Sequence, residues 1–437
     1  MSVPNAHAAS YYRERIGDDT LRLSLEGRAH ADVCVIGGGL AGLTTARELA
    51  RRGRRVILLE GERIGWGASG RNAGFVSAGF SEGLDTLERR VGLDQARALY
   101  ALSCAGVAYV RDTIVASGRQ DIVSGRGKLK VLRHAGTGAL KRSRDALAQK
   151  YGVEQAFWPR EHLREVLRTP VYHGALFDPD AFHIDPLAYA QEVARCCEAA
   201  GGWIFEGSPV SRIARIGAGW RVETDIGVVH AETVVLATSA YGVLHHTYAP
   251  VDRAILPVAT HVVVTEPLGA RLAEAIRFPG CVADTRRCGD YFRVVAGGRL
   301  LWGGRITTRR SEPSRLADLL KADILKVFPQ LGDVRIDHAW SGLMGYSVRK
   351  MPLVGPVRPG LWAATALGGH GLNTSATVAD LVASGICDGD DRWRLFAPFA
   401  VRWGGGLIGR LATRFEYGRL RLADRIDERA ARGAARA

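Results

Sequence analysis

The segment Ala31–Glu60 constrains the fold most, because it joins two short apolar runs through a helical stretch. The run Val33–Ile36 is too short for a helix and rich in β-branched residues, which predicts a buried strand. A helix is expected over Leu40–Arg52, and Val56–Leu59 predicts a second strand. Strand, helix and strand in this order form a βαβ unit, so the sequence predicts a parallel sheet with a helix packed on it.

Three glycines mark the first turn of this unit. Gly37, Gly39 and Gly42 follow the spacing G-x-G-x-x-G directly after the first strand. The first glycine permits a tight turn, the second lets a pyrophosphate approach the backbone, and the third lets helix and strand pack closely. Glu60 ends the second strand, where a carboxylate accepts hydrogen bonds from a ribose. Together these features predict a dinucleotide site; a glycine-rich turn without a ligand is the alternative.

Length and composition indicate the class of protein. The 437 residues, of which 47% are hydrophobic and 24% charged, predict a globular protein of two domains. No apolar run approaches the roughly 18 residues of a membrane span, and residues 1–10 lack a secretion signal, so we expect a cytoplasmic protein. The seven cysteines include no C-x-x-C pair, so neither a disulfide framework nor a metal site is expected.

The net charge of +14 comes mainly from arginine, since 7 of the 59 basic residues are lysine. The arginines are dispersed, without the basic stripe and stacking aromatic residues of a nucleic-acid-binding protein. We therefore expect a solvated arginine-rich surface and no nucleic-acid partner. The basic stretch 126–144 is also expected to form a solvated face.

The rest of the chain divides into two patterns. Residues 1–30 are mixed and polar, which predicts a surface arm, and Asp185 caps a helix that is expected to end at residue 200. From residue 255 onward, strands without intervening helices predict a largely antiparallel sheet. The other expected elements are a helix at 94–117, strands at 128–132, 203–205, 210–216, 220–224, 228–230, 234–237, 255–265, 291–295, 300–302 and 361–365, and helices at 314–327 and 371–384.

Two further glycine-rich junctions need the same explanation as the first. The loop GASGRNAG contains Ser69, Arg71 and Asn72, which offer hydrogen bonds and a positive charge to the middle of a dinucleotide. The segment GGHGLNTS precedes a helix and places backbone N–H groups at its start. A flavin gains negative charge near N1 and O2 on reduction, and a helix N-terminus stabilises that charge. The three junctions therefore favour a flavin dinucleotide.

These motifs resemble the FAD-dependent D-amino-acid oxidase family, which includes glycine and sarcosine oxidases. The resemblance covers residues 31–384 and rests on VIGGGLAGLTTARELARRG, WGASGRNAG, HIDPLAYA and GGHGLNTSATVADL. Among the branches of the family, the chain is most similar to the bacterial γ-glutamylputrescine oxidoreductase type. The resemblance implies an α/β fold (α+β overall), with a Rossmann-like FAD-binding domain and a largely antiparallel-sheet substrate domain. The expected divisions are an N-terminal arm (1–30), the FAD-binding domain (31–85, 185–245 and 355–394), the substrate domain (86–184 and 246–354) and a basic C-terminal helical extension (395–437).

The resemblance also assigns residues to the cofactor. Some relatives attach FAD through a cysteine near the GLMGYS segment, which has none in this chain, so we expect non-covalent FAD. Val210 is expected to meet the adenine through its backbone, and Thr238 to line the nucleotide site. The implied FAD-binding residues are Gly37, Gly39, Leu40, Ala41, Gly42, Glu60, Gly61, Arg63, Gly67, Ala68, Ser69, Arg71, Asn72, Val210, Thr238, Gly369, His370, Gly371, Leu372, Asn373 and Thr374.

The implied activity is oxidation of an amine or amino acid at its C–N bond. A hydride passes to flavin N5, the imine hydrolyses, and the electrons go to dioxygen or another acceptor. His370, Tyr291, Arg293 and Arg349 are the candidate catalytic or substrate contacts; a satisfied buried histidine, a core tyrosine and a solvated arginine are the alternatives. No lysine occurs around GGRLLWGG, where sarcosine oxidases have one, which argues against rapid oxidase turnover. A dehydrogenase that reduces a quinone or partner protein, and a non-catalytic flavoprotein, remain alternatives.

The C-terminal segment predicts a basic amphipathic helix. Apolar residues recur near helical spacing from residue 407 to residue 426, with arginines between them. Such a helix can lie on an anionic membrane or dock on its own protein with its arginines solvated. The small number of apolar residues and the interruption at Gly418 favour docking.

Overall fold

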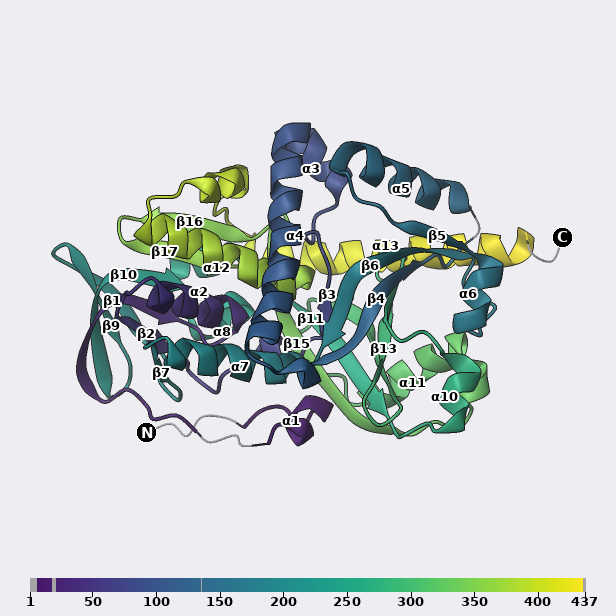
Figure 1. Cartoon of the computed structure of the whole chain (residues 1–437), viewed down its shortest axis with the longest axis horizontal. Helices are drawn as coiled ribbons and strands as arrows, with labels where there is room; N and C mark the ends of the chain where they lie inside the picture. Colours follow the sequence, from purple (N-terminus) through teal and green to yellow (C-terminus); the bar gives the residue numbers. More distant parts are fainter. Residues whose placement is uncertain (1–5, 18–20, 135, 435–437) are drawn as a thin grey trace.

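The computed structural model describes residues 6–17, 21–134 and 136–434. Its two sheets lie side by side, with the first on the left of Figure 1 and the second on the right. The long helix α4 (Leu93–Ala116) stands between them. The architecture is the mixed α/β fold that the sequence predicts, with one mostly parallel and one mostly antiparallel sheet.

The first sheet contains the predicted βαβ unit. Its strands follow the order β16-β17-β10-β1-β2-β7, with β9 paired to β10 and β8 to β9. The central pairs β1–β2, β1–β10, β10–β17 and β2–β7 are parallel. The strands are β1 (Gly27–Ile36), β2 (Val56–Leu59), β7 (Trp203–Phe205), β8 (Arg212–Ile216), β9 (Gly219–Glu223), β10 (Gly227–Leu236), β16 (Leu353–Arg358) and β17 (Leu361–Thr365).

A layer of helices packs against this sheet. α2 (Leu40–Arg51) contacts both α7 (Pro186–Ala199) and α12 (Gly371–Cys387), and their apolar side chains share one core with the sheet. The predicted cap of α7 is present, because Asp185 Oδ1 accepts hydrogen bonds from the N–H groups of Leu187 and Ala188, each at 3.1 Å. Capping of this kind stabilises a helix by about 1 kcal/mol.

The second sheet follows the order β15-β11-β14-β13-β12-β4-β6-β3, with β5 paired to β6. All of these pairs except β12–β4 are antiparallel, so the sheet is largely antiparallel as predicted. Its core includes Phe292 stacked on Trp302 with ring centroids 4.8 Å apart. The strands are β3 (Phe75–Val76), β4 (Val123–Val131), β5 (Ala156–Pro159), β6 (Gly174–Ile184), β11 (Ile255–Thr265), β12 (Cys281–Asp284), β13 (Tyr291–Val295), β14 (Arg299–Thr307) and β15 (Ile336–Ser347).

Shorter helices connect and cover these strands. They are α1 (Tyr11–Arg15), α3 (Leu84–Val91), α5 (Thr137–Tyr151), α6 (Arg160–Val166), α8 (Ser239–His245), α9 (Ala249–Asp252), α10 (Ala270–Ala275) and α11 (Leu316–Val327). The 29-residue helix α13 (Gly406–Ala434) is drawn in yellow and runs across the right half of Figure 1. The helix predicted in the C-terminal extension is therefore present.

Four predictions about local structure need correction. The strands expected at 228–230 and 234–237 form one continuous strand, β10. The strand expected at 210–216 begins at Arg212, and the one expected at 128–132 begins earlier, at Val123. The N-terminal arm is not a simple surface segment, because Tyr12 of α1 is fully buried and its hydroxyl donates to the Asn72 carbonyl at 2.9 Å. An aromatic pair in a polar stretch was a weak signal of this anchoring.

Among the described residues, one helix, α4, is long and apolar enough to span a membrane, judged by its length and composition alone. The mean hydropathy of its most apolar window is 1.2, and 44% of that window is buried. α4 packs closely on α12: a Cβ added at Gly106 would lie 2.3 Å from the Asn373 carbonyl oxygen. The expectation of no membrane span rested only on continuous apolar runs. Helix α4 does not contain such a run, because polar residues are interspersed among its apolar ones.

Candidate active site

A cavity of about 740 Å³ lies at the carboxyl ends of β1, β2 and β10 and extends to residues of the second sheet. The carboxyl ends of parallel strands are where α/β proteins bind ligands. The three glycine-rich junctions meet here, although they are far apart in the sequence. The predicted site residues that line the cavity are Gly37, Gly39, Leu40, Ala41, Glu60, Gly61, Gly67, Ala68, Ser69, Arg71, Asn72, Val210, Thr238, Tyr291, Gly369, His370, Gly371 and Leu372.

The first junction requires glycine for steric reasons. Gly37 has a φ of +113°, and an added Cβ would lie 2.8 Å from the Ala237 carbonyl oxygen. A Cβ at Gly42 would lie 1.9 Å from the Gly37 carbonyl oxygen, so helix α2 could not approach β1 as closely. Helix α2 begins at Leu40, and Gly39, Leu40 and Ala41 all line the cavity. Its N-terminus therefore faces the cavity, as a pyrophosphate site requires.

Glu60 follows β2 and turns its carboxylate into the same end of the cavity. Its two oxygens accept hydrogen bonds from the N–H groups of Gly38 (2.5 Å) and Glu62 (2.8 Å). Burial nevertheless raises the pKa of Glu60 to about 7, against the lowering effect of these two N–H groups. A carboxylate has about four acceptor positions, so two remain for the hydroxyl groups of a ribose.

The second junction, which includes the short 3₁₀ turn Ala68–Gly70, is held by its own side chains. Ser69 Oγ accepts a hydrogen bond from the Leu40 N–H at 2.9 Å, which leaves its O–H to donate to a ligand. The Asn72 amide donates to the carbonyls of Ala68 and Ser69 and accepts from the Gly74 N–H. Asn72 therefore holds the shape of the loop, in place of the ligand hydrogen bond that the sequence suggested.

Arg71 lies over the face of Trp66, with its guanidinium carbon 4.3 Å from the ring centroid. Its Nε donates to the Trp66 carbonyl at 2.7 Å, and the Arg71 carbonyl accepts from Trp340 Nε1 at 2.9 Å. The guanidinium therefore keeps a fixed position at the cavity wall. The guanidinium can donate charge-assisted hydrogen bonds to an anionic group of a ligand.

The third junction begins before helix α12. The Gly369 N–H donates to Ser81 Oγ at 2.6 Å, so this N–H is not free for a ligand as the sequence suggested. Thr374 Oγ1 donates to the His370 carbonyl at 2.6 Å and fixes the start of the helix. Burial lowers the pKa of His370 to about 3, and the charge of Lys128 adds to this effect. The imidazole is therefore neutral at physiological pH.

Lys128 and Ser77 form the wall of the cavity beside His370. Lys128 Nζ donates to Ser77 Oγ at 2.9 Å, and the His370 ring is hydrogen-bonded to the Ser77 backbone. Lys128 lies on β4, inside the basic stretch that was expected to face solvent, so this prediction was wrong for Lys128. Lys128 pairs in register with Asp178 of β6. Burial raises the pKa of the Asp178 carboxyl, and the charge of Lys128 opposes this effect. Charge pattern alone could not show which basic residue turns inward.

Aromatic hydroxyls complete this end of the cavity. Tyr291 lies against β14, where a Cβ at Gly303 would come within 2.1 Å of its ring, and its hydroxyl is 2.7 Å from Thr260 Oγ1. Tyr346 also lines the cavity, and burial raises the pKa of both tyrosines. Both phenols are therefore neutral. The glycine pair in LLWGGR indicates that a bulky group packs against this strand. The sequence could not show that this group is the Tyr291 ring.

Six predicted residues do not line the cavity. Gly42, Arg63, Asn373 and Thr374 belong to segments that reach the cavity through neighbouring residues, such as Ala41, Glu62 and Leu372. Arg293 is buried, with hydrogen bonds to His183 Nδ1 (2.7 Å), the Tyr12 hydroxyl and the Ile184 carbonyl, and so connects α1 to the second sheet. Arg349 donates to the Pro398 carbonyl at 3.1 Å. The geometry gives no support to a substrate contact by Arg293 or Arg349.

The cavity fits a flavin dinucleotide. Its volume lies within the range of roughly 300–1,000 Å³ that small-molecule sites occupy. The glycine cradle at α2, the remaining acceptor positions of Glu60, the O–H of Ser69 and the Arg71 charge match the pyrophosphate and ribose groups of FAD. The lining contains no cysteine among the described residues, so the wall offers no thiol for a covalent link.

Comparison with known proteins agrees with this assignment. Residues 32–384 match the family model described as FAD dependent oxidoreductase. The chain is 32% identical to a probable oxidoreductase, OrdL, of Haemophilus influenzae, over 93% of this chain and 95% of that protein. It is also 32% identical to the γ-glutamylputrescine oxidoreductase of Escherichia coli, over 90% and 92% of the two chains.

Solved structures show the same fold. The glycine oxidase of Geobacillus kaustophilus superposes with a TM-score of 0.69 and 22% identity, over 85% of this chain and 98% of that one. The match of the family model over most of the chain, together with these relatives, settles the family. The chain belongs to the FAD-dependent oxidoreductases, and its cofactor is FAD.

Proposed function

We propose that this protein oxidises an amine at its C–N bond and that its substrate also carries a carboxylate, as an amino acid or a longer amino-carboxylic acid does. The observation that carries the proposal is the position of Lys128 in the cavity wall. The names of two relatives, γ-glutamylputrescine oxidoreductase and glycine oxidase, support an amine substrate. We place the activity in the cytoplasm, where the seven free cysteines remain reduced.

Lys128 is suited to bind an anion. Its ammonium group has three N–H donors, of which one is directed to Ser77 Oγ, so two remain for a carboxylate. The carboxylate side chains among the described lining residues are those of Glu60 and Glu62, which follow β2 at the end of the cavity that receives the nucleotide. A substrate carboxylate therefore meets a positive charge beside His370 and no competing negative side chain in the lining there.

The same charge also acts on the amine. A positive group at the reacting end disfavours a bound ammonium, so Lys128 promotes binding of the amine as its free base. His370 remains neutral and offers a hydrogen bond without adding charge. When bound, FAD supplies the redox chemistry by accepting a hydride from the carbon next to the nitrogen. Tyr291 and Tyr346 narrow the cavity and exclude water from this region.

A panel of amines with and without a carboxylate tests the proposal. Anaerobic mixing should bleach the flavin band with carboxylated amines and leave it unchanged with simple alkylamines of the same length. Subsequent exposure to air or to a soluble quinone then distinguishes an oxidase from a dehydrogenase. In Lys128→Met, kcat/KM for the best carboxylated amine should fall about tenfold to hundredfold, because a charged hydrogen bond contributes about 1.5–3 kcal/mol.

Lys130→Met is the matched control. Lys130 lies two residues further along β4 but does not line the cavity, so its loss should change kcat/KM far less. If Lys128→Met and Lys130→Met have equal effects, Lys128 does not bind the carboxylate. If no amine bleaches the flavin, the proposed activity itself is wrong.

A further inference from the structure

Helix α13 turns the carboxylates of Asp424, Asp427 and Glu428 toward the body of the protein. Asp424 is buried, and its carboxylate accepts hydrogen bonds from the N–H groups of Arg287 (3.1 Å) and Cys288 (3.2 Å). Asp427 forms an ion pair with the Arg287 guanidinium at 2.8 Å. The inner face of α13 is therefore anchored by carboxylates on arginines and backbone N–H groups.

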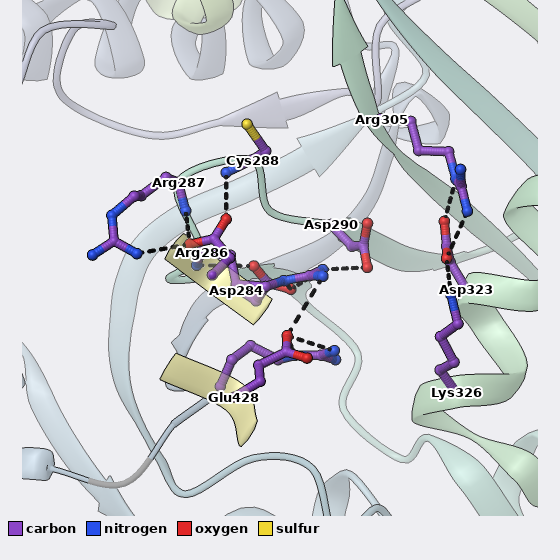
Figure 2. A network of polar contacts seen from close by, with 11 residues as sticks. Asp284, Arg286, Arg287, Cys288, Asp290, Arg305, Asp323, Lys326 and Glu428 are labelled. Carbon is purple, nitrogen blue, oxygen red and sulfur yellow. Dashed lines mark hydrogen bonds and ion pairs between the residues drawn. The ribbon is translucent and has the colours of Figure 1, made fainter. Parts of the chain in front are cut away.

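Glu428 continues this anchoring next to the cavity wall. It lies 3.2 Å from Arg133 and 3.7 Å from Arg286, and Arg286 also pairs with Asp284 and Asp290. Figure 2 shows Arg286 at the centre of these contacts, with Glu428 reaching it from the helix. Ala283 and Gly289, which flank this network in the sequence, line the cavity. The inner face of α13 thus rests on the loop that forms one wall of the active site.

The outer face of α13 is apolar. Six large side chains recur along it at helical spacing and are all more than half exposed: Leu407 (67%), Ile408 (75%), Leu411 (56%), Phe415 (77%), Leu422 (57%) and Ile426 (57%). Trp403, just before the helix, is 67% exposed as well. A helix docked on its own protein normally buries its apolar face and exposes its charges. As the sequence predicts, the helix lies on its own protein. Its apolar face, however, points to solvent and not to the protein.

An exposed apolar face of this size marks an interaction site. We propose that the outer face of α13 docks on an anionic lipid membrane, lying in the plane of the interface with its apolar side chains among the lipid chains. Phe, Leu and Trp are the residues that interfacial helices insert, and arginines beside them attract anionic headgroups.

The charges around the apolar face favour lipid over a protein partner. Arg414, Arg425 and Arg429 are exposed on the same side of the helix, and Arg414 and Arg425 form no ion pair with any described residue. The carboxylates of Asp424, Asp427 and Glu428 are held on the inner side and do not oppose an anionic surface. The whole chain adds a net charge of +14. A second copy of the chain would bring like charges together, which disfavours self-association through this face.

Sedimentation with vesicles tests the proposal on the full-length protein with FAD bound. The protein should pellet with vesicles of phosphatidylcholine mixed with phosphatidylglycerol and remain in solution with phosphatidylcholine alone. The variant Leu411→Ser/Phe415→Ser/Leu422→Ser should lose at least about tenfold in partition, since each side chain contributes apolar area. Arg414→Gln/Arg425→Gln should lose on the order of tenfold on anionic vesicles, and added salt should reproduce that loss.

In the matched control, serine replaces three exposed apolar residues that lie outside α13. Val115, Trp203 and Val348 are exposed by 59%, 62% and 59%, so Val115→Ser/Trp203→Ser/Val348→Ser removes equally exposed apolar side chains outside α13 and should sediment like the wild type. All variants should keep their FAD content, because none of the changed residues lines the cavity. Equal sedimentation of the two triple-serine variants would overturn the proposal. So would a dimer in sedimentation velocity that the α13 variant alone dissociates, because a second copy would then occupy the face.

Discussion

At the scale of single residues, burial of Glu60 in the binding site is unfavourable for its charged form, and a bound ligand can offset this effect. Two N–H donors favour its charged form, yet burial outweighs them and raises its pKa to about 7. In the absence of a ribose, the folded protein therefore holds a carboxyl group that prefers to be protonated. Hydroxyl donors of the cofactor compensate for that preference.

This leads to a prediction on pH dependence. The folded-state pKa of Glu60 lies above its ordinary value of 4.5, so its contribution to stability is fully present below about pH 4.5 and is lost as the pH rises through about 7. The free energy of unfolding of FAD-free wild type should therefore fall by up to about 3 kcal/mol relative to Glu60→Gln between pH 4.5 and pH 8. Urea denaturation of both proteins across this range measures the difference; parallel curves would contradict it.

The pKa of His370 is shifted away from neutral pH, whereas that of Glu60 is shifted toward it. Burial and Lys128 keep its imidazole neutral, so it does not titrate in the physiological range. The sequence identified His370 through its place between glycines but could not show its protonation state, because Lys128 comes from a strand 242 residues earlier in the chain. Long-range neighbours of this kind set the chemistry of the site.

At the scale of elements, the junction of β1 and α2 depends on contact between backbones. A Cβ at Gly42 would lie 1.9 Å from the Gly37 carbonyl oxygen, whereas a Cβ at Gly418 in α13 would meet nothing within 4 Å. Both residues are inside helices, so alanine has the same intrinsic advantage at each position.

We therefore predict opposite effects of the same substitution. Gly42→Ala should destabilise the protein by roughly 1–3 kcal/mol and weaken FAD binding, because α2 must move away from β1. Gly418→Ala should stabilise it by up to about 1 kcal/mol through helix propensity and leave FAD unaffected. Thermal unfolding and FAD titration of both variants check this. A Gly42→Ala protein as stable as wild type would mean that the packing is looser than the structure indicates.

Local patterns predicted most elements of the fold, since the βαβ unit, the capped helix α7 and the antiparallel sheet all have short-range signals. The nucleotide half of the cavity followed from the same signals, because its glycines and Glu60 lie within one unit. Lys128, Ser77 and Tyr346 could not be predicted, because their place depends on how β4 and β15 pair within the second sheet. The contact between Arg293 and Tyr12 could not be predicted either, because the two residues lie 281 positions apart in the sequence.

At the scale of the whole molecule, the cofactor site joins parts of the chain that are far apart in the sequence. The cavity draws its lining from both sheets, so bound FAD should hold them together. A ligand that binds the folded state alone stabilises it in proportion to its affinity and concentration.

Release of the cofactor provides a prediction at this scale. The purified protein should be yellow, and acid precipitation should leave FAD in the supernatant and a colourless pellet, because no described lining residue is a cysteine. Absorbance of the two fractions measures the split. Colour that stays with the pellet after washing would show a covalent link to another residue type.

The order in which the chain is synthesised gives the discontinuous first sheet a further consequence. β1 and β2 emerge early from the ribosome, but β10 and β17, which pair beside them, come roughly 170 and 300 residues later. At 5–20 residues per second, the nascent glycine turn waits on the order of tens of seconds before Gly369–Leu372 can close over it. During that interval α2 can cover one apolar face of β1 and β2, but the partners of the opposite face, such as Val229 and Leu361, are not yet made. That face therefore needs temporary cover, from a chaperone or from other parts of the nascent chain, until the last third of the protein is made.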